Sequence, residues 1–431
     1  MTSTYHANLL TEGDPRLVKF KQYLIQSAST ELQSRLTGKA QDREIVRGLL
    51  QGIYEKSKAG LTPEVRDVVI GAALAELVGY GPLEWLLSDP ETSEIMVNGS
   101  QSVFIERNGE LLETDVRFEN DEHLMRIIER IVNPLGRRLD TDNPTADARL
   151  PDGSRVNIII PPVAIDGPHI TIRKFLQTKM TMEELVEMGA LTAYMAKFLE
   201  ACVVTRLNVL VTGNTSSGKT TILNALSGYI PERERIVTIE DAVELQLRQK
   251  HVVRLETKLA GVDGAGSVSV RDLVRNALRM RPDRIVVGEV RGGEAMDMLQ
   301  AMNTGHTGSL TTLHANSPRD ATSRLETMAM MAGLDMPLLA IRKQIASAIN
   351  LIVHLGRLTD GTRRMTHITE LAGMEGDVVT LTDIFKFEQT GVGPDGKVIG
   401  QLRPTGMRPL FSPRLEASGY KLGGEIFGAG L

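Results

Sequence analysis

Two glycines five positions apart, followed at once by lysine and threonine, constrain the fold of this chain more than any other feature. The segment follows the apolar run at 207–211 and reads Gly213-Asn214-Thr215-Ser216-Ser217-Gly218-Lys219-Thr220, with Thr221 next. Between a buried strand and a helix, such glycines let backbone N–H groups curl around a phosphate. Lys219 can then reach the β- and γ-phosphate oxygens, and the Thr220 hydroxyl can ligate Mg²⁺. The pattern predicts a nucleotide-binding loop rather than an ordinary Gly/Ser turn.

Length and charge indicate a multidomain protein of ordinary composition. The 431 residues are too many for one typical core, so two or three domains are expected. A net charge of −5 leaves no basic excess that would make nucleic acid the main partner. The single cysteine, Cys202, allows no internal disulfide and fits a reducing compartment. The first 13 residues lack the long apolar region of a secretory signal, so we expect a cytoplasmic protein.

Hydrophobic periodicity divides the first 190 residues into three parts. Apolar residues at helical spacing predict a small helical bundle over 1–70. An α+β domain is expected over 71–176. Its expected elements are hairpins at 103–111 and 149–160, a helix at 122–132 and a strand at 169–175. A linker is expected over 177–190, where a capping box begins the next helix.

Strands and helices alternate through the second half. The expected strands are 207–212, 235–240, 251–256, 284–289 and 309–313, and the expected helices are 191–203, 218–228, 268–280 and 292–303. That order predicts an α/β domain over 191–431, with a mainly parallel sheet covered on both faces. The tail after 388 indicates turns with a weak final hairpin.

The strand at 284–289 ends in a carboxylate. Ligands bind at such strand ends in parallel sheets. The common form of this strand carries Asp-Glu, but Gly288 replaces the first acid here. Glu289 is therefore the candidate base or water-orienting group, unless it merely caps the following helix.

Three carboxylates follow another strand end. Glu240, Asp241 and Glu244 lie within five residues of one another. Beside a triphosphate with Mg²⁺ such acids can hold the metal, partly through water. The alternative is a solvated acidic loop.

Two histidines bracket a short polar strand. His306 and His314 are eight residues apart, and this even spacing places both on one face if the strand is regular. Without a further Cys/His cluster nearby a zinc site is disfavoured. We expect histidines that sense or contact the γ-phosphate, although a lone histidine is more often a hydrogen-bonded core residue.

The order of these four segments resembles the secretion-ATPase superfamily that drives type II secretion, type IV pili and type IV secretion. The resemblance covers roughly 70–415 and is closest to the tight-adherence (Tad/Flp) pilus ATPases of the CpaF/TadA type. In the N-terminal half it rests on Gly79-Tyr80-Gly81-Pro82-Leu83-Glu84, Glu94-Ile95-Met96-Val97-Asn98-Gly99, the segment from Ala148 to Asn157, and Ile170-Thr171-Ile172-Arg173-Lys174-Phe175. The tetracysteine zinc module of some type II secretion ATPases is absent from the sequence, which favours the other branches.

The resemblance implies roles for particular residues. Glu289 would be the catalytic glutamate, and Glu244 the acid nearest the metal or water. Arg155 and Arg173 would reach the γ-phosphate from the N-terminal domain; without the family they would be ordinary exposed strand positions. Arg275 and Arg279 form a like-charge pair on one helix, which costs stability unless an anion faces it. The family uses such arginines to contact the neighbouring subunit's nucleotide, whereas a solvated basic face is the plain alternative.

The resemblance also implies an assembly and its cofactors. Members are cytoplasmic homo-hexamers with a RecA-like ATPase domain that uses ATP and Mg²⁺, and they act at an inner-membrane platform protein. We therefore predict a pilus-assembly motor, peripheral at the inner membrane and without a stable nucleic-acid partner. The alternatives are a type IV secretion or conjugation motor, and a nucleotide-gated scaffold with little turnover.

Overall fold

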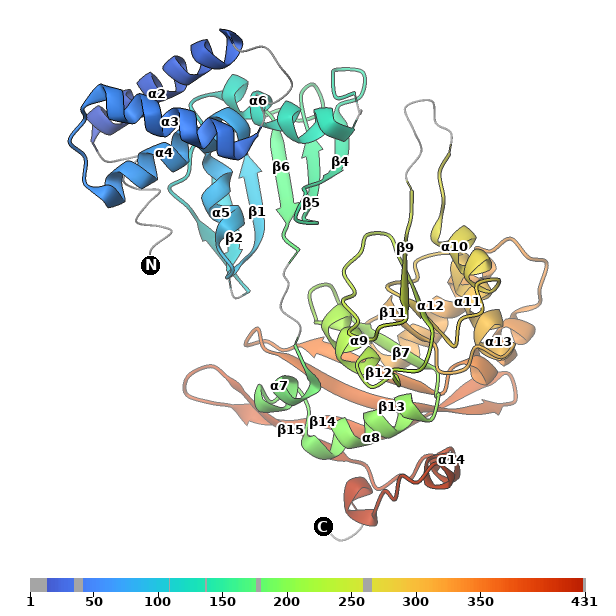
Figure 1. The fold of residues 1–431 in the computed structure, drawn as a ribbon. Coiled ribbons are helices and arrows are strands. Elements are labelled where there is room, and N and C mark those ends of the chain that lie inside the picture. The colour runs from blue at the N-terminus through green and yellow to red at the C-terminus, as the bar shows by residue number, and fades with distance from the viewer. Residues whose placement is uncertain are drawn as a thin grey trace. The chain divides into compact units, whose positions relative to one another are not determined.

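The fold comes from a computed structural model that describes residues 14–34, 42–107, 109–135, 138–175, 180–258 and 266–428. The chain divides into two compact units, Met1–Gln177 and Thr178–Leu431 (Figure 1). Each unit has its own buried hydrophobic clusters. The first 13 residues, Asn108 of the expected first turn, residue 176 at the end of the expected α+β domain and residues 177–179 of the expected linker lie outside the described residues.

Three helices form the start of the first unit. They are α2 (Pro15–Ser34), α3 (Arg43–Ser57) and α4 (Pro63–Val78). The Asp42 carboxylate caps α3 by accepting two backbone N–H groups, and Pro63 begins α4 where its missing N–H is not needed. The predicted boundary at residue 70 is wrong because α4 runs through it. The helix is also tied to α6 (Asp121–Val132), since Glu76 Oε2 lies 2.9 Å from His123 Nε2.

A six-stranded antiparallel sheet completes this unit. Its strands are β1 (Thr92–Asn98), β2 (Val103–Arg107), β3 (Glu110–Glu113), β4 (Thr145–Arg149), β5 (Arg155–Ile159) and β6 (His169–Arg173), in the order β3-β2-β1-β6-β5-β4. The accompanying helices are η2 (Gly81–Leu83), α5 (Glu84–Ser88), α6 (Asp121–Val132) and η3 (Asn133–Leu135). Alternate residues such as Ile170 and Ile172 are buried with α6, so Arg173 belongs to the opposite face of the sheet.

The second unit is built on a nine-stranded sheet. Its strands are β7 (Val209–Gly213), β8 (Ile236–Glu240), β9 (Val252–Glu256), β10 (Arg284–Val287), β11 (Leu310–His314), β12 (Leu351–Arg357), β13 (Arg363–Glu375), β14 (Val378–Val392) and β15 (Val398–Pro404). The order is β15-β14-β13-β12-β7-β11-β10-β8-β9. Pairing is parallel from β12 to β9 and antiparallel from β12 to β15. The predicted α/β class is confirmed. The hairpin predicted after 388 is present where the end of β14 pairs with β15, whereas the antiparallel pairing of β12, β13 and β14 was not predicted.

Helices cover both faces of this sheet (Figure 1). They are α7 (Met182–Glu187), α8 (Ala193–Val204), α9 (Lys219–Ser227), α10 (Val270–Ala277), α11 (Glu294–Asn303), α12 (Pro318–Met330), α13 (Leu338–Ala348), α14 (Ser412–Ala417) and η4 (Gly424–Phe427). Val209 and Val211 of β7 pack in the cluster of α7 to α9, whereas Leu210 packs in the cluster of α10 to α13. The central strands are therefore buried on both faces, as expected for a doubly covered parallel sheet.

The predicted linker over 177–190 is wrong in its described part. Thr181 and Glu184 form the predicted capping box, but the α7 helix it begins belongs to the second unit. Met182 and Leu185 are buried in the same cluster as the central strands. Among the described residues, no helix has the length and apolar character needed to span a membrane.

Candidate nucleotide site

The phosphate loop joins β7 to α9, as predicted. Gly213 has a φ of 155°, and a Cβ there would lie 2.5 Å from the Leu355 carbonyl oxygen, so only glycine fits. Gly218 has a φ of 96°, and a Cβ there would meet no atom within 4 Å, so this part of the loop is open. The Ser217 hydroxyl is buried and has no hydrogen-bond partner within the described part of the chain. An open glycine loop with an unsatisfied hydroxyl beneath it fits a phosphate group.

The other loop residues divide by exposure. Asn214, Thr215 and Ser216 form the exposed rim, and Thr220 and Thr221 are half-buried in the first turn of α9. The hydroxyl that the motif assigns to Mg²⁺ therefore belongs to the helix N-terminus, where the helix dipole favours anions.

Lys219 is buried and turned into the loop. Its Nζ donates to the Asn214 carbonyl oxygen at 2.9 Å and lies 3.3 Å from His314 Nδ1. Because an ammonium group only donates, this contact makes Nδ1 the acceptor and assigns the proton to Nε2. Burial lowers the pKa of His314; Glu289 opposes the shift and Lys219 adds to it, so the neutral ring is favoured.

Glu289 follows β10 and faces the same histidine. Its Oε1 lies 2.8 Å from His314 Nε2, a short polar contact without the alignment of a hydrogen bond. Its Oε2 accepts from Arg291 Nη2 at 2.7 Å. The adjacent parallel strands β7, β11 and β10 bring these groups to one sheet edge. One imidazole thus links the candidate base to the lysine of the phosphate loop.

The acidic segment is next along the same edge. Glu240 is buried, and its Oε2 accepts the backbone N–H groups of Glu244 at 2.8 Å and Leu245 at 3.0 Å. A Cβ at Gly288 would lie 2.8 Å from Glu240 Cγ. The usual form of this strand carries an aspartate at the position of Gly288. In this chain the side chain of Glu240 fills the space beside that position. Glu240 therefore stabilises the loop after β8 by accepting its backbone N–H groups. Asp241 is exposed and Glu244 is half-buried.

The side chains near the phosphate loop limit how a magnesium ion could be bound. No group of three or more His, Cys, Asp or Glu side chains in the described ranges could hold a metal ion by itself. Magnesium commonly takes one or two protein ligands together with substrate phosphates and water. Thr220, Asp241 and Glu244 carry oxygen donors of the kind such a site uses, and their part in it stays a prediction.

One assumption behind the prediction for His306 is wrong. The strand begins only at Leu310, so His306 belongs to the turn before β11 and the assumed regular strand through both histidines is absent. The five residues of β11 advance about 3.3 Å each, which puts His306 at the opposite edge of the sheet from His314. Asn208 fixes that turn, because its Oδ1 accepts the Gly308 N–H at 2.7 Å.

Comparison with known proteins identifies the family. A family model described as "Type II/IV secretion system protein" matches residues 76–384. The chain belongs to this family. The match includes the phosphate loop, the acidic segment, Glu289 and His314, so the resemblance inferred from these segments is confirmed.

Several relatives carry names from conjugal transfer or type IV secretion. A Mycobacterium tuberculosis protein whose name assigns it to conjugal transfer is 40% identical over 313 residues, which cover 71% of this chain and 88% of the relative. The type IV secretion system protein VirB11 of Brucella suis is 32% identical over 318 residues, covering 67% of this chain and 90% of the relative. The crystal structure of a Brucella suis VirB11 ATPase aligns with 30% identity and a TM-score of 0.38, over 67% of this chain and 95% of that one.

The arginine pair predicted on one helix, Arg275 and Arg279, is not on one helix in the structure of this type II/IV secretion family member. Arg279 lies beyond the end of α10 and is exposed. Arg271 and Arg275 are the pair on the helix, and each Nε donates at 2.7 Å to one carboxylate oxygen of Asp297 on α11. The anion that offsets the like charges is therefore within the chain. The premise for a pair formed by Arg275 and Arg279 is wrong.

Arg155 and Arg173 belong to the first unit. They are directly opposite each other on β5 and β6. Arg173 is exposed, and its Nε donates to Glu94 Oε1 at 2.8 Å. The two arginines therefore form one patch on the sheet face away from the core, and their action on a nucleotide stays a prediction.

Sequence reasoning missed Arg291 and Asp297. Arg291 is two residues beyond Glu289, a short separation that could have marked it as a partner. Asp297 meets its two arginines only through helix packing, which no local pattern shows.

Proposed function

We propose that this chain is an ATP-hydrolysing motor of a type IV secretion or conjugal transfer system. The family match and the relatives' names support this class. They favour the conjugation alternative over the tight-adherence pilus predicted from the sequence. Secretion through a membrane requires energy. In this proposal that energy comes from ATP hydrolysis at the phosphate loop.

The contact chain from Lys219 through His314 to Glu289 is the observation that carries the proposal. A phosphate loop alone supports binding, whereas hydrolysis also needs a group that orients or deprotonates water. The carboxylate of Glu289 is 18% exposed, and His314 contacts both this carboxylate and the loop's own lysine. A nucleotide-gated scaffold would not require that arrangement.

In the proposed reaction, Lys219 leaves the Asn214 carbonyl and compensates charge on the β- and γ-phosphates of bound ATP. Glu289 orients the attacking water and accepts its proton. The water oxygen bonds to the γ-phosphorus while the bond from that phosphorus to the β–γ bridging oxygen breaks, which gives inorganic phosphate and ADP. When bound, Mg²⁺ supplies further charge compensation on the phosphates, with Thr220 and Asp241 or Glu244 as its protein ligands.

The proposed assembly is a homo-hexamer at the cytoplasmic face of the inner membrane, with a platform protein as partner. This part is supported by the family resemblance alone. Light scattering with a non-hydrolysable ATP analogue tests it: a nucleotide-dependent hexamer is expected, and a strict monomer with full activity at every concentration would contradict it.

Steady-state hydrolysis by the purified chain and its Lys219→Ala variant tests the activity. Turnover in the wild type that is abolished in the variant is expected, because no other cation in the loop can follow charge onto the γ-phosphate. Binding without turnover in the wild type, including under single-turnover conditions, would favour the scaffold.

A further inference from the structure

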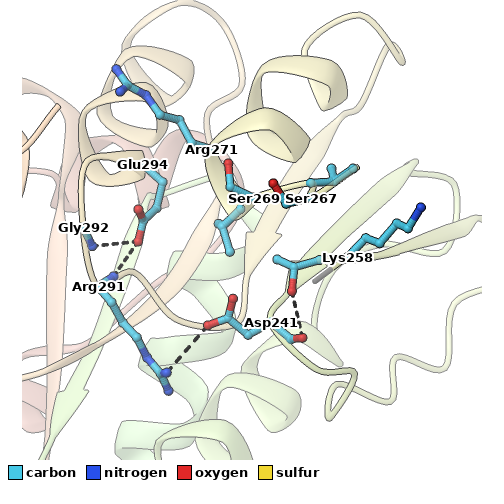
Figure 2. Close-up of a pocket in the computed structure, with 11 residues that line it drawn as sticks. Asp241, Lys258, Ser267, Ser269, Arg271, Arg291, Gly292 and Glu294 are labelled. Atoms are coloured by element: carbon cyan, nitrogen blue, oxygen red, sulfur yellow. Dashed lines mark hydrogen bonds and ion pairs between the residues drawn. The ribbon is translucent and has the colours of Figure 1, made fainter. Parts of the chain in front are cut away.

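The guanidinium of Arg291 lies between two acidic groups of the candidate site. Its Nη2 donates to Glu289 Oε2 at 2.7 Å, and its Nη1 lies 3.7 Å from Asp241 Oδ2. Figure 2 shows this side chain reaching toward Asp241 along the edge of an open pocket. One cation thus joins the carboxylate after β10 to the acidic segment after β8.

The backbone beneath this arginine is fixed on both sides. Glu294 Oε1 accepts the N–H groups of Arg291 at 2.6 Å and Gly292 at 2.8 Å, as Figure 2 shows. On the other side, a Cβ at Gly293 would lie 2.9 Å from Ala332 Cα, so the turn is pressed against the end of α12. The guanidinium therefore extends from a rigid base, which makes its placement reproducible.

The two oxygens of Glu289 have different neighbours. Oε1 faces His314 without a well-aligned hydrogen bond, so that contact alone does not fix the carboxylate plane. Oε2 has the aligned hydrogen bond, and it comes from Arg291. A planar guanidinium holds an oxygen more directionally than an ammonium does.

We propose that Arg291 is a positioning residue for hydrolysis, which fixes the plane of the Glu289 carboxylate and ties it to Asp241. This inference rests on the proposed ATP hydrolysis. The alternative is a surface ion pair: the Arg291 side chain is 61% exposed, and exposed pairs add little to stability. The two interpretations predict different effects of replacing Arg291. Loss of a positioning residue lowers kcat, whereas loss of a surface ion pair changes nothing measurable.

The experiment compares Arg291→Ala and Arg291→Lys with a matched control, Arg403→Ala. Arg403 is 57% exposed and lies 3.7 Å from the Glu388 carboxylate, so the control loses a similar exposed pair on β15. For Arg291→Ala we expect kcat to fall about 10- to 100-fold, the loss that a misplaced catalytic group produces. The melting temperature, KM for ATP and affinity for ADP should stay near the wild-type values.

Two further readouts separate positioning from a structural role. Arg291→Lys should recover little of the lost kcat, because a point charge cannot reproduce the planar donor. Guanidinium ion added below unfolding concentrations should restore part of the turnover of Arg291→Ala and none in the control. Rescue by the ion without lysine rescue is not expected from a simple packing defect.

Several results would overturn the inference. Wild-type kcat in Arg291→Ala would make the contact a surface pair, and a raised kcat would make it a restraint on Glu289. Loss of ADP affinity with kcat unchanged would make Arg291 a nucleotide contact. Failure of the proposed function itself is distinguishable, because the wild type would then show no turnover that depends on Lys219.

Discussion

A methyl group added at Gly288 should disturb the acidic segment. In Gly288→Ala the new Cβ would lie 2.8 Å from Glu240 Cγ, closer than real Cβ atoms approach a carbon. Glu240 cannot retreat easily, because its Oε2 holds the N–H groups of Glu244 and Leu245. Overpacking of this kind costs about 1–3 kcal/mol. For a unit of this size that corresponds to a melting temperature lower by about 2–10 °C.

A double-mutant cycle with Glu240→Ala tests the reasoning. Glu240→Ala removes the side chain that the new methyl group would strike, so Gly288→Ala should cost little in that background. Thermal melting of the four proteins gives the coupling between the two sites. An equal cost of Gly288→Ala in both backgrounds would show that Glu240 does not explain the glycine.

Three further outcomes are expected. His314→Ala should lower ATP turnover about 10- to 100-fold, whereas His306→Ala should leave it near the wild-type rate; equal losses in steady-state assays would contradict the placement of the two histidines. Arg155→Ala and Arg173→Ala should fold normally and bind ADP, yet lose most turnover, up to about 10³-fold, with poor rescue by lysine; unchanged turnover in both would reduce them to surface residues. Burial is the main cause that lowers the pKa of His354 from 6.5 to about 4. Because the unfolded chain takes up this proton more readily, the free energy of unfolding should fall by roughly 2–3 kcal/mol as pH drops from about 6.5 to 4. Urea unfolding at several pH values should show a smaller fall in His354→Gln, and an unchanged pH dependence in that variant would refute the assignment.

The sequence predicts the parts of this fold that are set by local pattern. An apolar run, two glycines and a lysine follow one another closely in the sequence. This pattern makes β7, the phosphate loop and α9 recognisable. Apart from its final hairpin, the antiparallel extension was missed because β13 and β14 carry register shifts, such as that between Ile368 and Thr369, that break the alternation of a regular strand. Contacts between distant elements were also beyond reach. His306 and His314 show this limit of sequence reasoning. Their spacing is visible in the sequence, but the start of β11 at Leu310 is not.

Glu289→Gln tests most directly whether the carboxylate beside His314 drives hydrolysis. The amide keeps the shape of the side chain but cannot accept the proton of water. We expect ADP affinity near the wild-type value and a kcat lower by about 10²- to 10⁴-fold. Hydrolysis at close to the wild-type rate would contradict the assignment of the base and move it to the acidic segment at 240–244.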